Sequence, residues 1–140
     1  MKRLLYFGLI LIFGCTSGQT EYTTIINYDP IGNIKYMIEE NPCQEYNIYV
    51  HFDGGFEDDE ITIRYGQTKT QIDSVTTDES TGYATHVIIP LFGVPEVSVS
   101  KSNGPILKID VSKSQSNIWS IYFYHDTLVA QALKRLPIYM

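Results

Sequence analysis

The feature that most constrains the fold is an alternation of apolar and polar residues that begins at Glu45 and recurs to the end of the chain. Alternate side chains of a β-strand point to opposite faces, so this period of two indicates strands with one buried and one solvated face. The alternation is clearest at 46–52, 61–65, 97–99, 107–111 and 119–123, and shorter apolar or β-branched runs occupy 69–72, 83–89 and 128–133.

Turn-forming residues separate these runs. They are Asp53-Gly54-Gly55, Gly66-Gln67, the loop 78–82, Asn103-Gly104-Pro105 and His125-Asp126. Short strands with a turn every eight to twelve residues are typical of sandwiches. The sequence therefore predicts an all-β fold, a single antiparallel β-sandwich of about seven or eight strands. We expect it to be immunoglobulin-like or transthyretin-like, because the Cys, Trp, Cys spacing of true immunoglobulin domains is missing.

The residues before Glu45 are less regular. The polar stretch 16–24 is rich in Thr and Ser and predicts a flexible tether. Ile25-Ile26 is a candidate first strand. Asp29-Pro30 is typical of a helix start, and Ile31, Ile34 and Ile38 follow at helical spacing, so a short helix is expected there.

The first fifteen residues have the three-part layout of an export signal. A basic Met1-Lys2-Arg3 precedes the apolar run 4–13, and Gly14-Cys15 follows directly. Ten helical residues reach only about 15 Å, half the thickness of the hydrocarbon layer, so the run is too short for a permanent span. The alternatives are a signal peptide or a buried core segment.

The tetrapeptide Ile12-Phe13-Gly14-Cys15 resembles the lipobox of bacterial lipoproteins. The resemblance implies cleavage before Cys15, diacylglycerol on the Cys15 thiol and acylation of the freed amine. Two or three acyl chains, such as palmitate, anchor a protein stably, whereas one does not. Thr16 follows the Cys, and by the same resemblance the absence of Asp there favours the outer membrane; the face of the membrane stays open. An ordinary secretory signal is the alternative.

The expected organisation is a signal peptide at 1–14, a lipidated Cys and tether at 15–24, and a β-sandwich at 25–140. Lys2 and Arg3 are two of the ten basic residues, and all sixteen acidic residues follow position 20, so the part after the leader has a net charge of −8. Such a surface repels phosphate backbones and anionic headgroups. We expect no nucleic-acid partner, and membrane attachment through the lipid anchor alone.

Carboxylates crowd the turn between two predicted strands, at Asp53, Glu57, Asp58 and Asp59, with Glu60 beside them. Calcium binds six to eight oxygens, so a Ca²⁺ site is one interpretation, although the spacing is not that of an EF-hand. The other interpretation is a solvated acidic hairpin that protects a sheet edge. Apart from this possible Ca²⁺, no cofactor is expected.

Tyr49, Tyr122 and Tyr124 are predicted on the face opposite the core residues of their strands. If those strands are neighbours, the three rings form an aromatic surface able to stack on a sugar or to bury a side chain of a protein partner. Ordinary cross-strand aromatic pairing is the alternative.

Catalytic motifs are missing from the sequence. It has no Gly-x-Ser-x-Gly elbow, no Ser-x-x-Lys pair, no phosphate-binding loop and no Cys-x-x-Cys, and His51, His86 and His125 are widely spaced. Cys43 has no disulfide partner if Cys15 is lipidated. We therefore expect a lipid-anchored envelope protein whose sandwich is a non-catalytic binding or scaffold module. The alternatives are a carbohydrate- or calcium-binding surface domain, or a small enzyme with an unrecognised site.

Overall fold

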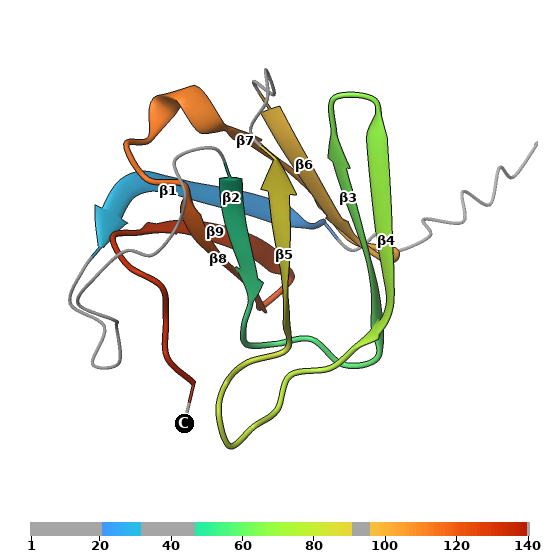
Figure 1. The fold of residues 1–140 in the computed structure, drawn as a ribbon. Coiled ribbons are helices and arrows are strands. Elements are labelled where there is room, and N and C mark those ends of the chain that lie inside the picture. The colour runs from blue at the N-terminus through green and yellow to red at the C-terminus, as the bar shows by residue number, and fades with distance from the viewer. Residues whose placement is uncertain (1–20, 32–46, 91–95, 140) are drawn as a thin grey trace, which may run out of the picture.

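The computed structural model describes residues 21–31, 47–90 and 96–139, which form nine β-strands and one 3-10 turn (Figure 1). The elements are β1 (Thr23–Ile31), β2 (Asn47–Phe52), β3 (Asp59–Tyr65), β4 (Thr68–Val75), β5 (Thr85–Pro90), β6 (Glu96–Lys101), β7 (Ile106–Asp110), η1 (Val111–Lys113), β8 (Ile118–Tyr124) and β9 (Thr127–Leu133). Among the described residues, no helix is long and apolar enough to cross a bilayer.

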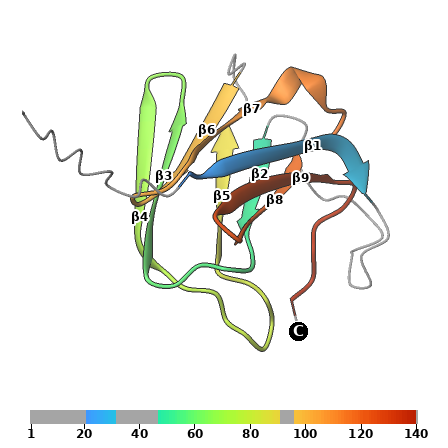
Figure 2. The ribbon, with the colours of Figure 1, turned by 180° about the vertical axis from the view of Figure 1, so that it is seen from behind.

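The strands form two sheets that face each other (Figures 1 and 2). The five-stranded sheet has the order β1-β9-β8-β2-β5, and the four-stranded sheet has the order β4-β3-β6-β7. The predicted all-β sandwich is thus confirmed. It has more strands than expected, and two pairs in the five-stranded sheet, β1 with β9 and β2 with β8, are parallel where antiparallel pairing was predicted.

The core lies between the sheets and is built from the alternating residues that the sequence pattern marks. Trp119, Phe52 and Phe56 are the largest fully buried side chains. Branched aliphatic residues surround them: Ile48, Val50, Ile61, Ile63, Ile89, Val97, Val99, Leu107, Ile109 and Ile121. Burial of such side chains contributes roughly 1.5–3 kcal/mol each, which makes the inward faces of the strands the main stabilising feature.

The helix expected from Asp29-Pro30 is wrong at its start, because both residues belong to strand β1. Pairing with β9 on both sides of these residues, at Asn27 and Ile31, keeps the segment extended, whereas a short isolated helix is only marginally stable. Pro30 is tolerated because β1 is an edge strand. Ile34 and Ile38 lie outside the described residues. Thr23 and Thr24, which were expected in a tether, instead pair with Thr127 and Leu128. Cys15 and Cys43 lie outside the described residues as well.

The outer face of the five-stranded sheet also carries buried apolar side chains. Ile118, Val129 and Leu133 are at most 6 % exposed but do not belong to the cluster between the sheets. The segment after β9, residues 134–139, runs beside the β4–β5 loop in both views (Figures 1 and 2). This outer face is therefore only partly open to solvent.

Candidate functional site

A row of polar side chains crosses the outer face of the five-stranded sheet. In the pairing register His86 lies opposite His51, and His51 opposite Ser120. Asp53 follows directly after β2, and its backbone N–H continues the parallel pairing by donating to the carbonyl of Ile121 at 2.8 Å. Side chains two residues apart on a strand share a face, so Asp53 lies on the same face as His51.

The backbone of Asp53 is also held by Thr77, which lies in the β4–β5 loop. The Thr77 hydroxyl donates to the Asp53 carbonyl oxygen at 2.6 Å and accepts from the backbone N–H of Phe56 at 3.0 Å. These bonds fix the turn that follows β2, so the direction of the Asp53 side chain is set by the backbone.

Two hydroxyl groups donate hydrogen bonds to the Asp53 carboxylate, one to each oxygen. Ser120 Oγ reaches Oδ2, and the phenol of Tyr139 reaches Oδ1. Burial raises the pKa of the Asp53 carboxyl above its ordinary value, and the hydrogen bonds from Ser120 and Tyr139 oppose part of that rise. Asp53 is thus a half-buried acceptor whose two oxygens face different neighbours.

Tyr139 packs against Tyr83, which belongs to the β4–β5 loop. Their ring centroids are 4.4 Å apart, with the planes tilted by 39°. The loop is shaped by Asp78, whose carboxylate accepts from the backbone N–H groups of Ser80 at 2.8 Å and Thr81 at 3.3 Å. This turn presents Tyr83 to the outer face, and the Tyr83 phenol lies 2.5 Å from His86 Nδ1.

His51 is one of the buried polar groups of the site, with 9 % of its surface exposed. Its ring stacks on that of His86 at 5.8 Å and lies 6.0 Å from that of Tyr139. Neither ring nitrogen has a hydrogen-bond partner within the part of the chain that the structure describes. Burial, together with the charge of His86, lowers the pKa of His51 to about 4, so the imidazole is neutral at physiological pH.

A surface hollow of about 420 Å³ opens beside this row; we call it the Asp53 groove. Its lining residues are Asp53, Gly54, Gly55, Ser120, Tyr122, Phe123 and Tyr124. Gly54 and β8 are joined by a hydrogen bond from the Phe123 N–H to the Gly54 carbonyl at 3.0 Å. The groove therefore combines a carboxylate and a hydroxyl with two tyrosines that project from the same face of β8.

A second hollow of about 440 Å³ adjoins the groove and shares Gly55, Phe123 and Tyr124 with it. It adds Glu57, Asp59, Lys101 and His125. The Asp59 carboxylate already has two partners in this hollow. It forms an ion pair with Lys101 Nζ at 2.8 Å and accepts a hydrogen bond from the Glu57 N–H at 2.9 Å. Lys101 Nζ also lies 4.6 Å from the centre of the Phe123 ring.

The four carboxylates considered for calcium have separate environments. Asp53 faces the outer side of the sheet, Asp59 pairs with Lys101, and Glu57 and Asp58 are exposed. Within the described ranges, no three His, Cys, Asp or Glu side chains lie together as metal ligands would. A Ca²⁺ site at this turn thus stays a prediction, and the geometry brings only Glu57 and Asp59 to one hollow.

The predicted aromatic surface is assembled in part. Tyr122 and Tyr124 line one groove, but Tyr49 pairs with Ile118, four residues earlier on β8 than Tyr122. At about 3.3 Å per residue, that separation is roughly 13 Å along the strand. Tyr49 shares their face of the sheet but not their groove.

The sequence did not indicate Ser120, Tyr83 or Tyr139 as residues of the site, and it gave His51 no role. The alternation in β8 could have indicated Ser120, because it lies two residues before Tyr122 and therefore on the same face of the strand. No local signal marks Tyr83 or Tyr139, since their place depends on the path of a loop and of the segment after β9.

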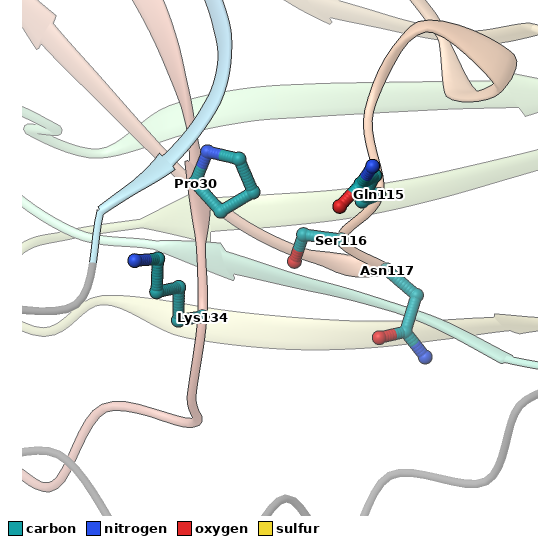
Figure 3. A pocket seen from close by; sticks show the side chains of 5 residues that line it. All are labelled: Pro30, Gln115, Ser116, Asn117 and Lys134. Carbon is teal, nitrogen blue, oxygen red and sulfur yellow. The ribbon is translucent and has the colours of Figure 1, made fainter.

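Another hollow, of about 260 Å³, lies at the far end of the five-stranded sheet (Figure 3). Pro30 and Lys134 lie on one side of it, and Gln115, Ser116 and Asn117 on the other. The Ser116 hydroxyl already bonds the backbone of Ile118 and Leu133. This hollow is smaller and lacks the carboxylate and aromatic groups of the Asp53 groove.

No family model, curated protein or solved structure matches this chain. Ser120 donates to a carboxylate and makes no hydrogen bond to a His51 nitrogen, so these two residues do not form a Ser-His pair of the kind that activates a nucleophile. The groove offers hydrogen-bond acceptors, a hydroxyl and aromatic surface, which are groups for binding.

Proposed function

We propose that this chain is a lipid-anchored cell-envelope protein whose β-sandwich binds a neutral carbohydrate in the Asp53 groove without catalysing a reaction. The single observation that carries the proposal is that the Asp53 carboxylate lines the same hollow as Tyr122 and Tyr124, which project from one face of β8. The anchor is supported by the resemblance of Ile12-Phe13-Gly14-Cys15 to a lipobox.

The chemistry of a sugar matches these groups. A charged acceptor such as Asp53 forms stronger hydrogen bonds with hydroxyl groups than a neutral one does. The faces of tyrosine rings stack on the apolar C–H faces of pyranoses, which aligns the hydroxyls toward the groove. The volume of about 420 Å³ lies in the range of ordinary small-molecule sites.

Charge narrows the class of ligand. After removal of the leader the net charge is −8, and the neighbouring hollow contributes Glu57 and Asp59. Lys101, the cation of that hollow, is paired with Asp59. An anionic glycan would therefore be repelled, and a neutral one is favoured.

The test is a panel of neutral oligosaccharides, with binding mapped by NMR chemical shifts and measured by calorimetry. We expect a member of the panel to shift the Tyr122 and Tyr124 resonances. Asp53→Asn should weaken binding by about tenfold or more, because a hydrogen bond to a charged group contributes about 1.5–3 kcal/mol. Tyr122→Ala should also weaken binding, because it removes a ring on which the sugar stacks.

Tyr49→Ala is the matched control, since Tyr49 lies on the same face but outside the groove. Its affinity should equal that of the parent protein. A panel that leaves Tyr122 and Tyr124 unshifted would refute the proposal, as would equal loss of affinity in the Tyr49→Ala and Tyr122→Ala variants.

A further inference from the structure

Tyr139 is held in the manner of a bound ligand. Its ring packs on Tyr83 at 4.4 Å and lies 6.0 Å from His51, and its hydroxyl donates to Asp53. These three contacts come from β2, from the residue after it and from the β4–β5 loop, so a cradle built by two parts of the chain receives a side chain from a third. The same segment exposes Lys134, Arg135 and Ile138 to solvent.

The cradle is continuous with the Asp53 groove through one carboxylate. Ser120, which lines the groove, donates to Oδ2, whereas Tyr139 donates to Oδ1. A ligand in the groove and a ring in the cradle would therefore contact opposite sides of Asp53. Neighbouring rings of one oligosaccharide have this kind of relation.

A phenol does not use everything that the cradle offers. It has one hydroxyl group, and in the described chain both nitrogens of the buried His51 ring stay without a hydrogen-bond partner. Leaving a buried polar group unsatisfied costs about 1–3 kcal/mol. A sugar ring has several hydroxyl groups, so it could donate to Asp53, stack on Tyr83 and also satisfy His51.

We propose that His51, Asp53 and Tyr83 form a second sugar-ring subsite, which Tyr139 occupies as an internal ligand until an oligosaccharide displaces it. The inference rests on the proposed carbohydrate function and extends it. It makes Tyr139 an intramolecular competitor whose removal strengthens binding of ligands with two or more rings.

The experiment uses the full chain and its Tyr139→Ala, Tyr139→Phe and Ile138→Ala variants, with melting curves to verify folding. The first probe is p-cresol, which reproduces the Tyr139 side chain. Tyr139→Ala should bind p-cresol saturably, with NMR shifts at Tyr83 and His51. The parent protein and Ile138→Ala should not bind it, because Tyr139 fills the site, and adding Asp53→Asn to Tyr139→Ala should weaken binding at least tenfold.

The second probe is a neutral oligosaccharide series of one, two and three rings. We expect Tyr139→Ala to raise affinity for two and three rings by about tenfold and to leave the single ring unchanged. Tyr139→Phe keeps the ring but loses the hydroxyl bond, so its affinity should fall between those of the parent and Tyr139→Ala.

Two results overturn the subsite: no p-cresol binding by folded Tyr139→Ala, or equal binding by the parent protein. An affinity gain that is equal for one ring and for three refutes the assignment of a second sugar position. If p-cresol binds Tyr139→Ala but no sugar binds any variant, the proposed function fails and the sugar assignment fails with it. If sugars bind the parent and p-cresol binds no variant, only the subsite fails.

Discussion

Gly55 occupies a position that only glycine fits. Its φ is +91°, and a Cβ at this residue would lie 1.8 Å from the carbonyl oxygen of Phe123. The turn after β2 therefore approaches the backbone of β8 directly, and this contact forms one wall of the Asp53 groove.

We predict that Gly55→Ala lowers the free energy of unfolding by about 2–4 kcal/mol, because the turn must move away from β8 and adopt a strained φ. Urea unfolding measures the change. Gly54→Ala is the control, since no atom lies within 4 Å of its Cβ position and its φ is not positive. A Gly54→Ala loss as large as that of Gly55→Ala would contradict the explanation.

His51 gives the stability a defined pH dependence. Its pKa is about 4 in the folded chain and 6.5 in its unperturbed state, so between these values the unfolded chain binds a proton that the folded chain does not. The free energy of unfolding should therefore fall as the pH decreases from 6.5 to 4, by about 2 kcal/mol in total. The raised pKa of Asp53 acts in the opposite sense, because the folded chain holds that proton more tightly.

Urea unfolding at several pH values tests this prediction against His51→Gln, which cannot titrate. Between pH 6.5 and 4, the free energy of unfolding of the variant should not show the decrease that His51 causes in the parent protein. If the free energy of unfolding changes equally with pH in the two proteins over that range, His51 is not the cause of the decrease.

At the level of single residues the sequence predicted turns better than contacts. Asp53-Gly54-Gly55 and His125-Asp126 are turns, as predicted. The φ angle is positive at Gly55 (91°), His125 (46°) and Asp126 (58°), a backbone conformation in which Gly, Asp, Asn and His are enriched. The contact between Tyr139 and Asp53 was not predictable, since it joins positions 86 residues apart and depends on packing alone.

Tyr28 joins the edge strand β1 to β8 of its own sheet and to β7 of the opposite sheet. Its ring meets the Trp119 ring edge-on at 5.8 Å, and its hydroxyl accepts from the Asp110 N–H at 3.2 Å. The Ser114 hydroxyl donates to the Tyr28 carbonyl oxygen at 2.7 Å. Because no residue of β1 is fully buried, this edge strand depends on such contacts.

We predict that Tyr28→Ala lowers the free energy of unfolding by about 2–3 kcal/mol, whereas Tyr28→Phe, which loses only the hydroxyl bond, lowers it by about 1 kcal/mol. Hydrogen exchange should accelerate in β1 more than in β8 in the Tyr28→Ala variant. Equal effects of the two substitutions would mean that the ring contact with Trp119 does not hold the strand.

The alternating pattern predicted β2, β3, β6, β7 and β8 because each has one face in the core. It predicted β1 only in part: Ile25-Ile26 was a candidate strand and lies in β1, but the spacing of Ile31, Ile34 and Ile38 favoured a helix over the end of this strand. Parallel pairing of β1 with β9 joins distant parts of the chain, and strand patterns do not encode partners.

At the scale of the molecule, the sequence indicated individual residues of the site but not that they lie together. Asp53, Tyr122 and Tyr124 were candidates for different functions, and the pairing of β2 with β8 brings them into one groove. Tyr49 and the other carboxylates shared the same sequence signals but lie elsewhere, because register along paired strands decides which outward residues meet.

Attachment to a membrane is the property that concerns the whole chain. If Cys15 is lipidated, the protein should be found in the membrane fraction, and its intact mass should show loss of residues 1–14 and a gain of acyl chains. Cys15→Ser should abolish the acyl mass and release the protein from membranes. A parent protein that keeps its first fourteen residues, or a Cys15→Ser protein that stays bound, would contradict the anchor.

The parallel pairing of β1 with β9 has a mechanical consequence. Thr23 enters the sheet beside Thr127, and the following residues stay in register through Asn27 with Gln131. A force that reaches Thr23 along the chain acts parallel to both strands, so it loads these hydrogen bonds together in shear and does not open them one after another. If the chain is anchored through Cys15, tension from the anchor is therefore shared by these hydrogen bonds at once.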